Sequence, residues 1–173
     1  MNLNRQCEKI IKELANGSKT ALASLYNAVG RQMYVVAYNV LGDYQLSEDV
    51  IQESLITIYE KAGTLNDTKA AHAWLIMIVR NKALDVLRHR NHEVPTEDFA
   101  PYMPEYTVSD KSELSMDVQN ALNQLSEDER QIVLMKTTMG FSHRDIANVL
   151  NMSVEACQKK YQRLLRRLKD YLK

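Results

Sequence analysis

Residues 142–167 decide the fold class, and they read SHRDIANVLNMSVEACQKKYQRLLRR. Ser142 and Asp145 have the spacing of a capping box, in which a hydroxyl and an acid satisfy the first N–H groups of a helix. This predicts a short helix over His143–Leu150. Asn151 follows it, and asparagine tolerates the left-handed conformation that a tight turn often needs. The stretch therefore predicts a short helix that ends in a tight turn.

A second helix, predicted over Val154–Leu172 with Ser153 as its N-cap, has two chemically distinct faces. Its apolar stripe, the expected core face, contains Cys157, Tyr161, Leu164, Leu165, Leu168 and Leu172. Its polar face contains Gln158, Lys159, Gln162, Arg163 and Arg166, with Lys160 and Arg167 at the flanks. These residue types suit base edges and phosphates, so the pair of helices predicts a DNA-binding helix-turn-helix. The alternative is a solvated charged face on an ordinary helical bundle.

Apolar residues recur with a helical period along most of the remaining chain. Towards the N-terminus the predicted helices are Leu3–Ala15, Lys19–Leu41, Ser47–Ala62 and Lys69–Arg90. Towards the C-terminus, Leu114–Leu125 and Glu127–Thr138 precede the two helices above. Ser126 and Glu129 form a second capping box, and Gly140 is a helix stop. No useful length of chain alternates with period two, so the predicted class is all-α.

The stretch between residues 93 and 117 differs in composition from its surroundings. It contains all three prolines and seven acids against Lys111 alone, without a sustained helical period. We interpret residues 93–113 as a flexible acidic linker. It would join two small helical domains, residues 1–92 and residues 114–173.

The overall composition is that of a folded cytoplasmic protein. Of the 173 residues, 45% are hydrophobic and 25% are charged, which is ordinary for globular chains. No apolar run approaches the length that spans a bilayer, and the first eight residues are too polar for a signal peptide, so we expect no membrane insertion. Cys7 and Cys157 form no paired framework, so both should be free thiols in a reducing compartment.

Charge is segregated along the chain although the formal net charge is zero. Residues 154–173 contain seven basic residues and two acids. Residues 43–60 contain five acids and neither Lys nor Arg. Clustered cations are what phosphate contacts need, and clustered acids suit a basic protein surface. The pattern favours a chain that contacts both nucleic acid and a basic partner.

The helix predicted over Lys69–Arg90 carries an aromatic residue away from its core arc. The core arc contains Ile76, Val79, Ala83, Val86 and Leu87. The far side contains Trp74, Ile78, Asn81, Asp85 and Arg88. An exposed tryptophan with polar neighbours can stack on unpaired bases and read them. Burial of Trp74 under another helix is the alternative, and the residues leave both open.

The helix predicted over Ser47–Ala62 has an acidic face. It should bury Ile51, Leu55 and Ile58, and present Asp49, Gln52, Glu53 and Glu60. Such a face can bind a basic partner helix, or it can merely meet water.

The chain offers no constellation typical of an enzyme. His143, Arg144 and Asp145 resemble the start of a kinase catalytic loop, but Leu150 stands where that motif has Asn, and no Gly-rich phosphate loop precedes it. His89 and His92 have no further metal ligand nearby. We therefore predict no catalysis, no cofactor and no metal.

The motifs in this order resemble those of the extracytoplasmic-function sigma factors. LGD at residues 41–43 and SEDVIQE at 47–53 are similar to that family's second conserved region. AWLIMIVRNKALDVLR at residues 73–88 resembles its promoter-melting helix. LSEDER at residues 125–130 and residues 146–163 resemble its fourth region. The resemblance spans about residues 25–168 apart from the linker.

The resemblance implies a role for each face. Core RNA polymerase would be bound by Asp49, Gln52 and Glu53. The melted minus-ten element would be bound by Trp74, Asn81, Asp85 and Arg88, with the loop Gly63–Ala71. The minus-thirty-five element of promoter DNA would be read by Gln158, Lys159, Gln162 and Arg163, with Lys160 and Arg166 on the same DNA-binding surface. An anti-sigma protein is a further expected partner, and the linker would thread through the polymerase's exit path.

The sequence also departs from the family pattern at two places. Cys157-Gln158 stands where members usually have Val-Lys or Val-Arg, and neither Ala71 nor His72 is aromatic. Two other functions remain open on the residues alone. A free-standing helix-turn-helix repressor would bind duplex operator tightly without polymerase. A helical scaffold would show no salt-dependent DNA affinity.

Overall fold

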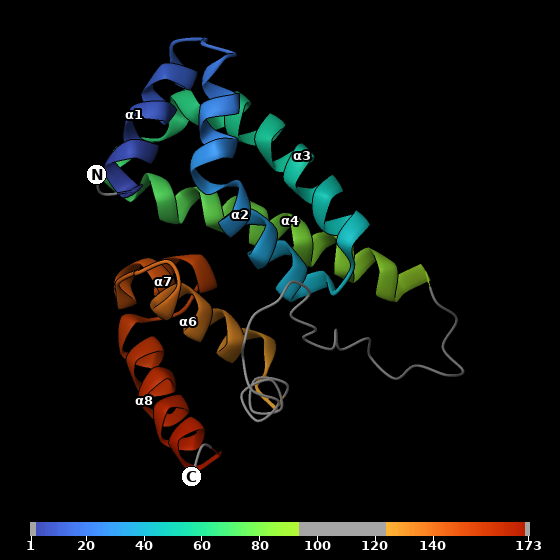
Figure 1. The fold of residues 1–173 in the computed structure, drawn as a ribbon, viewed down its shortest axis with the longest axis vertical. Helices are drawn as coiled ribbons and strands as arrows, with labels where there is room; N and C mark the ends of the chain where they lie inside the picture. Colours follow the sequence, from blue (N-terminus) through green and yellow to red (C-terminus); the bar gives the residue numbers. More distant parts are fainter. Residues whose placement is uncertain (1–2, 94–123, 172–173) are drawn as a thin grey trace. The chain divides into compact units, whose positions relative to one another are not determined.

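The computed structural model describes residues 3–93 and 124–171. All regular structure in these two ranges is helical, as predicted (Figure 1). Contacts divide the chain into two compact units, an N-terminal and a C-terminal one, which confirms the prediction of two helical domains. The predicted linker and nearly all of the predicted helix Leu114–Leu125 lie outside the described residues.

The N-terminal unit is built around one central helix. Its elements are α1 (Leu3–Ala15), α2 (Ala21–Leu41), α3 (Tyr44–Lys61), the 3-10 turns η1 (Ala62–Thr64) and η2 (Thr68–Ala70), and α4 (Ala71–Glu93). Helix α2 packs against α1, α3 and α4 (Figure 1). The largest fully buried side chains in this unit are Ile11, Leu25, Met33, Leu41, Ile58, Leu75 and Ile76.

Helix α3 begins three residues before its predicted start at Ser47. Gly42 ends α2 with φ 61°, and the carboxylate of Asp43 caps α3 by accepting the N–H of Leu46 at 3.0 Å. Ser47 is buried inside the helix, where its Oγ donates to the carbonyl of Asp43 at 2.6 Å. An aspartate therefore takes the N-cap position, which its side chain favours, and the predicted first residue Ser47 lies one turn inside the helix.

The C-terminal unit confirms the predicted caps of the helix-turn-helix. It contains α6 (Glu127–Thr137), α7 (His143–Leu150) and α8 (Val154–Tyr171). Both predicted capping boxes are formed. Asn151 has φ 52° and ψ 50° in the turn, and Ser153 Oγ accepts the N–H of Ala156 at 3.1 Å. Local hydrogen bonds therefore fix the turn between α7 and α8.

The apolar stripe of α8 is narrower than predicted. Cys157 and Leu164 are fully buried, and Tyr161 and Leu168 are half-buried. Leu165, predicted as core, is 43% exposed. The unit has two other described helices to cover α8, and the side chain next to Leu164 is rotated by about 100° around the helix. Leu165 therefore lies beyond the covered surface.

Three expectations from the sequence concern features that can be examined in the described residues. Cys7 and Cys157 are both buried free thiols, as predicted. In residues 3–93 and 124–171, no helix has the length and apolarity that crossing a bilayer requires. Within the same ranges, no group of three or more His, Cys, Asp or Glu side chains is placed to hold a metal ion.

Glu129 joins the two ends of the C-terminal unit. Its Oε2 accepts the N–H of Ser126 at 3.0 Å, and its Oε1 accepts from Arg167 Nη1 at 2.8 Å. Partial burial alone would raise the pKa of this carboxyl. The hydrogen bonds from Ser126 and the charge of Arg167 outweigh that effect, so the pKa of Glu129 is lower than usual. The ionised form is thus the one that the fold stabilises.

Replacing Glu129 with glutamine is expected to destabilise the C-terminal unit at pH 7 by about 1 kcal/mol. Because the folded pKa is the lower one, the carboxylate's contribution is complete above the unfolded pKa and is lost as pH falls through the folded value. Hydrogen exchange of the Leu164 amide at pH 7 and near pH 3 measures the effect, with Glu155→Gln as the control. An equal loss of protection at both pH values would contradict this interpretation.

Candidate nucleic-acid and partner-binding surfaces

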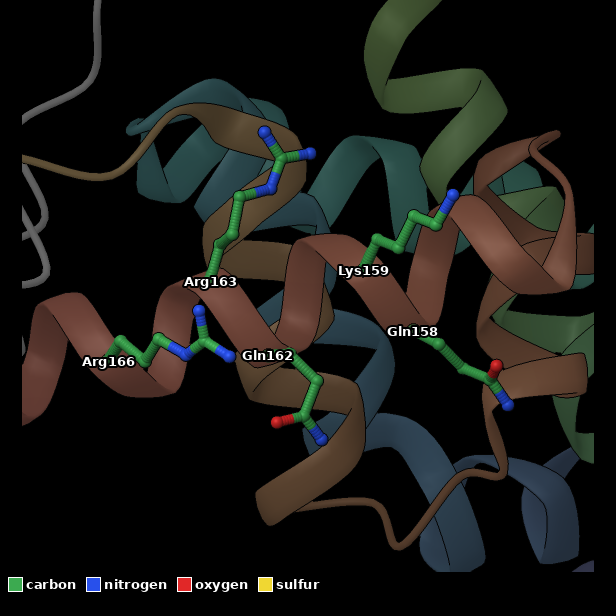
Figure 2. Close-up of a pocket in the computed structure, with 5 residues that line it drawn as sticks. All are labelled: Gln158, Lys159, Gln162, Arg163 and Arg166. Carbon is green, nitrogen blue, oxygen red and sulfur yellow. The ribbon is translucent and has the colours of Figure 1, made fainter.

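Five polar side chains of α8 lie exposed on one surface, which we call the α8 face. They are Gln158, Lys159, Gln162, Arg163 and Arg166, and they line one open pocket. Figure 2 shows all five extending from the same helix. The buried Cys157 and Leu164 fasten the opposite side of α8 to its unit. The predicted recognition residues are thus presented together on a supported helix, as groove reading requires.

The flanking cations of α8 instead bind acids of α6. Lys160 Nζ lies 3.5 Å from Asp128 Oδ2, and Lys160 is half-buried. Arg167 binds Glu129 and also donates to the carbonyl of Gln124 at 3.3 Å. These pairs hold α8 against α6. Lys160 remains predicted to bind DNA, but its ammonium would have to exchange Asp128 for a phosphate.

The far side predicted for α4 is not exposed along its whole length, because a residue near its middle is buried. Asn81 and Asp85 are exposed, and Trp74 is half-buried. Ile78, predicted on the far side, is only 9% exposed, so that prediction was wrong. The reason is that α4 packs against α1, α2 and α3, which bury more of it than a single apolar arc. The prediction for the core arc also differs from the structure in part, because Val86 and Leu87 are only half-buried.

The polar end of this row contains its own ion pair. Arg88 Nη1 lies 2.8 Å from Asp85 Oδ1, and both side chains are more than half exposed. An exposed pair of this kind contributes little to stability, so its partners can separate at small cost. The pair therefore leaves both side chains able to contact a ligand. Trp74, Asn81, Asp85 and Arg88 together form what we call the α4 row.

The acidic residues predicted on α3 are exposed. Asp49, Gln52 and Glu53 all reach solvent, and Glu53 Oε2 lies 3.5 Å from Lys82 Nζ of α4. Behind them Ile51 and Ile58 are buried as predicted, while Leu55 is only half-buried.

An apolar residue on the same side of α3 as these acids was not predicted. Ile56 is 60% exposed, the highest value among the exposed large apolar side chains of the described residues. It follows Gln52 by four residues and Asp49 by seven, a spacing that places all three on one side of a helix. That spacing was readable from the sequence. We call Asp49, Gln52, Glu53 and Ile56 the α3 face.

Comparisons with known proteins agree on one family. Residues 25–93 match the Sigma-70 region 2 model, and residues 115–168 match the Sigma-70, region 4 model. The RNA polymerase sigma-H factor of Pseudomonas aeruginosa is 25% identical over 191 residues, covering 96% of this chain and 99% of that protein. The ECF RNA polymerase sigma factor SigW of Bacillus subtilis is 25% identical over 162 residues, covering 85% and 86%.

A solved structure has the same fold. It is the sigma factor RpoE in complex with the anti-sigma factor NepR from Bartonella quintana, with a TM-score of 0.64 and 24% sequence identity. The match covers 87% of this chain and 95% of that one. The chain therefore belongs to the sigma-70 family of bacterial RNA polymerase sigma factors, in its extracytoplasmic-function group. As a member of this group it directs initiation of transcription from specific promoters.

Proposed function

We propose that the three surfaces divide the work of a sigma factor between the two units. The α3 face binds core RNA polymerase, the α4 row binds the melted minus-ten element with the loop Gly63–Ala71, and the α8 face reads the minus-thirty-five element. Residues 1–92 and 114–173 would be the two functional domains, with residues 93–113 as the linker.

One observation carries this proposal more than any other. The α8 face gathers two glutamines and three cations on the second helix of a capped helix-turn-helix. Glutamine and arginine can each make bidentate contacts to base edges in the major groove. An ordinary solvated helix has no need of a rigid turn that holds these side chains together. The acidic α3 face, by contrast, suits a basic protein surface and not DNA.

The test is reconstitution with core polymerase and a promoter library. We expect the chain to bind the core and to select a subset of promoters. Failure to associate with the core would refute the proposal. Tight binding of the isolated chain to duplex DNA would instead favour a repressor, and no salt-dependent DNA affinity in any assembly would favour a scaffold.

The regulation and location of the protein follow the same proposal. RpoE forms a complex with an anti-sigma factor, so we propose an anti-sigma protein as a partner of this chain too. Because its action requires the polymerase and the chromosome, we place the protein in the cytoplasm. The reaction chemistry would be the polymerase's, and this chain would act as a specificity subunit without catalysis of its own.

Arg163→Ala is expected to weaken recognition at one upstream base pair by ~1–3 kcal/mol if Arg163 contacts a base through two of its guanidinium nitrogens. Holoenzyme binding to promoters that vary at single upstream positions measures this. Arg167→Ala is the control, because Arg167 binds Glu129 within the unit and should change stability more than base preference. Equal losses on every promoter would leave Arg163 with a phosphate contact alone.

A further inference from the structure

Helix α1 is bonded to the segment that precedes Trp74. Asn4 donates from Nδ2 to the carbonyl of Lys69, and its Oδ1 accepts the N–H of His72 at 3.2 Å. The N–H of His72 belongs to the first turn of α4, where backbone donors have no partner inside the helix. One side-chain amide thus bridges η2 and the start of α4.

Glu8 makes a second contact with the same segment. It follows Asn4 by four residues, so both lie on one side of α1. Glu8 Oε1 accepts from Thr68 Oγ1 at 3.0 Å and from Lys12 Nζ at 2.8 Å. These hydrogen bonds, the one from Lys12 first, lower the pKa of Glu8, so it is an ionised acceptor at neutral pH. The buried side chains Cys7, Ile10, Ile11 and Leu14 fix α1 itself to the unit.

Other bonds fix the same segment from further directions. Asp67 Oδ1 accepts the N–H of Lys69 at 3.0 Å, and His72 Nε2 lies 2.6 Å from Gln32 Oε1 of α2. Residues 67–72 are therefore hydrogen-bonded to α1, to α2 and to one another. The residues just before them are exposed, among them Gly63, Thr64 and Asn66. A fixed base thus carries an exposed loop tip, and this base leads directly into α4, the helix that carries Trp74.

We propose that α1 positions the minus-ten binding surface, with Asn4 and Glu8 as the positioning residues. By fixing residues 67–72 before DNA arrives, they spare the loop the entropy of ordering on binding. The inference rests on the proposed role of the α4 row. It goes beyond the family match, since the region 2 model begins at residue 25, after α1 has ended.

Two near-isosteric substitutions test this in the holoenzyme of the full chain. Asn4→Asp keeps the acceptor for His72 but loses the donor to Lys69, and Thr68→Val removes the donor to Glu8. Each should weaken binding of a labelled single-stranded minus-ten oligonucleotide about fivefold, the effect of one hydrogen bond. Core affinity should stay unchanged, because none of these bonds involves the α3 face. Lys9→Gln is the matched control, with a side chain on α1 that is 80% exposed.

A second readout separates positioning from mere stability. Each variant should also change the ratio of affinities for oligonucleotides that differ at one base, which a loss of folded protein would not change. Wild-type affinity and ratio in both variants would overturn the inference, and so would a loss that follows the folded fraction alone. If Asn4→Asp fails to fold, Thr68→Val decides. A wild-type holoenzyme that does not prefer the minus-ten oligonucleotide to a scrambled one would overturn the proposed function itself.

Discussion

Replacing Ile56 with arginine is expected to weaken binding to core RNA polymerase by about 30- to 100-fold, or ~2–3 kcal/mol. Ile56 is 60% exposed in the free protein, so the change should leave the fold intact. An apolar side chain among acids and an amide is well placed to be the desolvated centre of an interface. Arginine there would put a cation against a partner surface that the acidic α3 face indicates to be basic.

Two matched variants make the result specific. Ile56→Leu keeps the apolar contact and should bind the core within a few-fold of wild type. Tyr26→Arg changes a residue of α2 that is 53% exposed and outside the α3 face, and it should bind as wild type does. Core affinity is measured by competition with a labelled wild-type chain. If Ile56→Arg and Tyr26→Arg bind equally well, Ile56 is not part of the docking surface.

Trp74→Ala is expected to lower the affinity of the holoenzyme for a single-stranded minus-ten oligonucleotide by about 10- to 100-fold. Stacking of one base on an aromatic ring contributes ~1–3 kcal/mol. Trp74 is only half-buried on α4, so part of its surface remains available to a base. Affinity for a duplex that carries only the minus-thirty-five element should not change, because the α8 face belongs to the other unit.

A second variant of Trp74 separates its contribution to packing from its stacking on a base. Trp74→Phe keeps an aromatic face and should retain most of the oligonucleotide affinity, while Trp74→Ala should not. Thermal unfolding of both variants gives the folded fraction by which the affinities are corrected. If the corrected affinity of Trp74→Ala equals that of wild type, the indole contributes only to packing in the hydrophobic core of its unit.

The interaction between α1 and the 67–72 segment was beyond sequence reasoning for a physical reason. Asn4 and Lys69 are 65 residues apart, and Glu8 and Thr68 are 60 apart. Neither pair has a local pattern that would reveal it, since the amide and the carboxylate read as ordinary polar positions on an amphipathic helix. The same holds for Lys160 with Asp128, which only the packing of α8 on α6 brings together.

A helical wheel was likewise unable to predict which single apolar residues are exposed. Ile78 was assigned outward and is buried, and Leu165 was assigned inward and is exposed. A wheel describes one helix, whereas burial depends on how many helices surround it. Among the helices that the structure describes, α4 is covered by three others and α8 by two, so the same apolar pattern is buried more widely in α4 than in α8.

Hydrogen bonds and helical periods that span three or four residues can be recognised in the sequence alone. They were sufficient to predict the all-α class, both capping boxes, the left-handed turn at Asn151 and the polar side of α8. Burial and pairing between distant residues depend on how the helices pack, because they sum contacts from several elements at once. The exposure of the cations of the α8 face, the burial of Ile78 and the attachment of α1 to the loop before Trp74 were decided at that level.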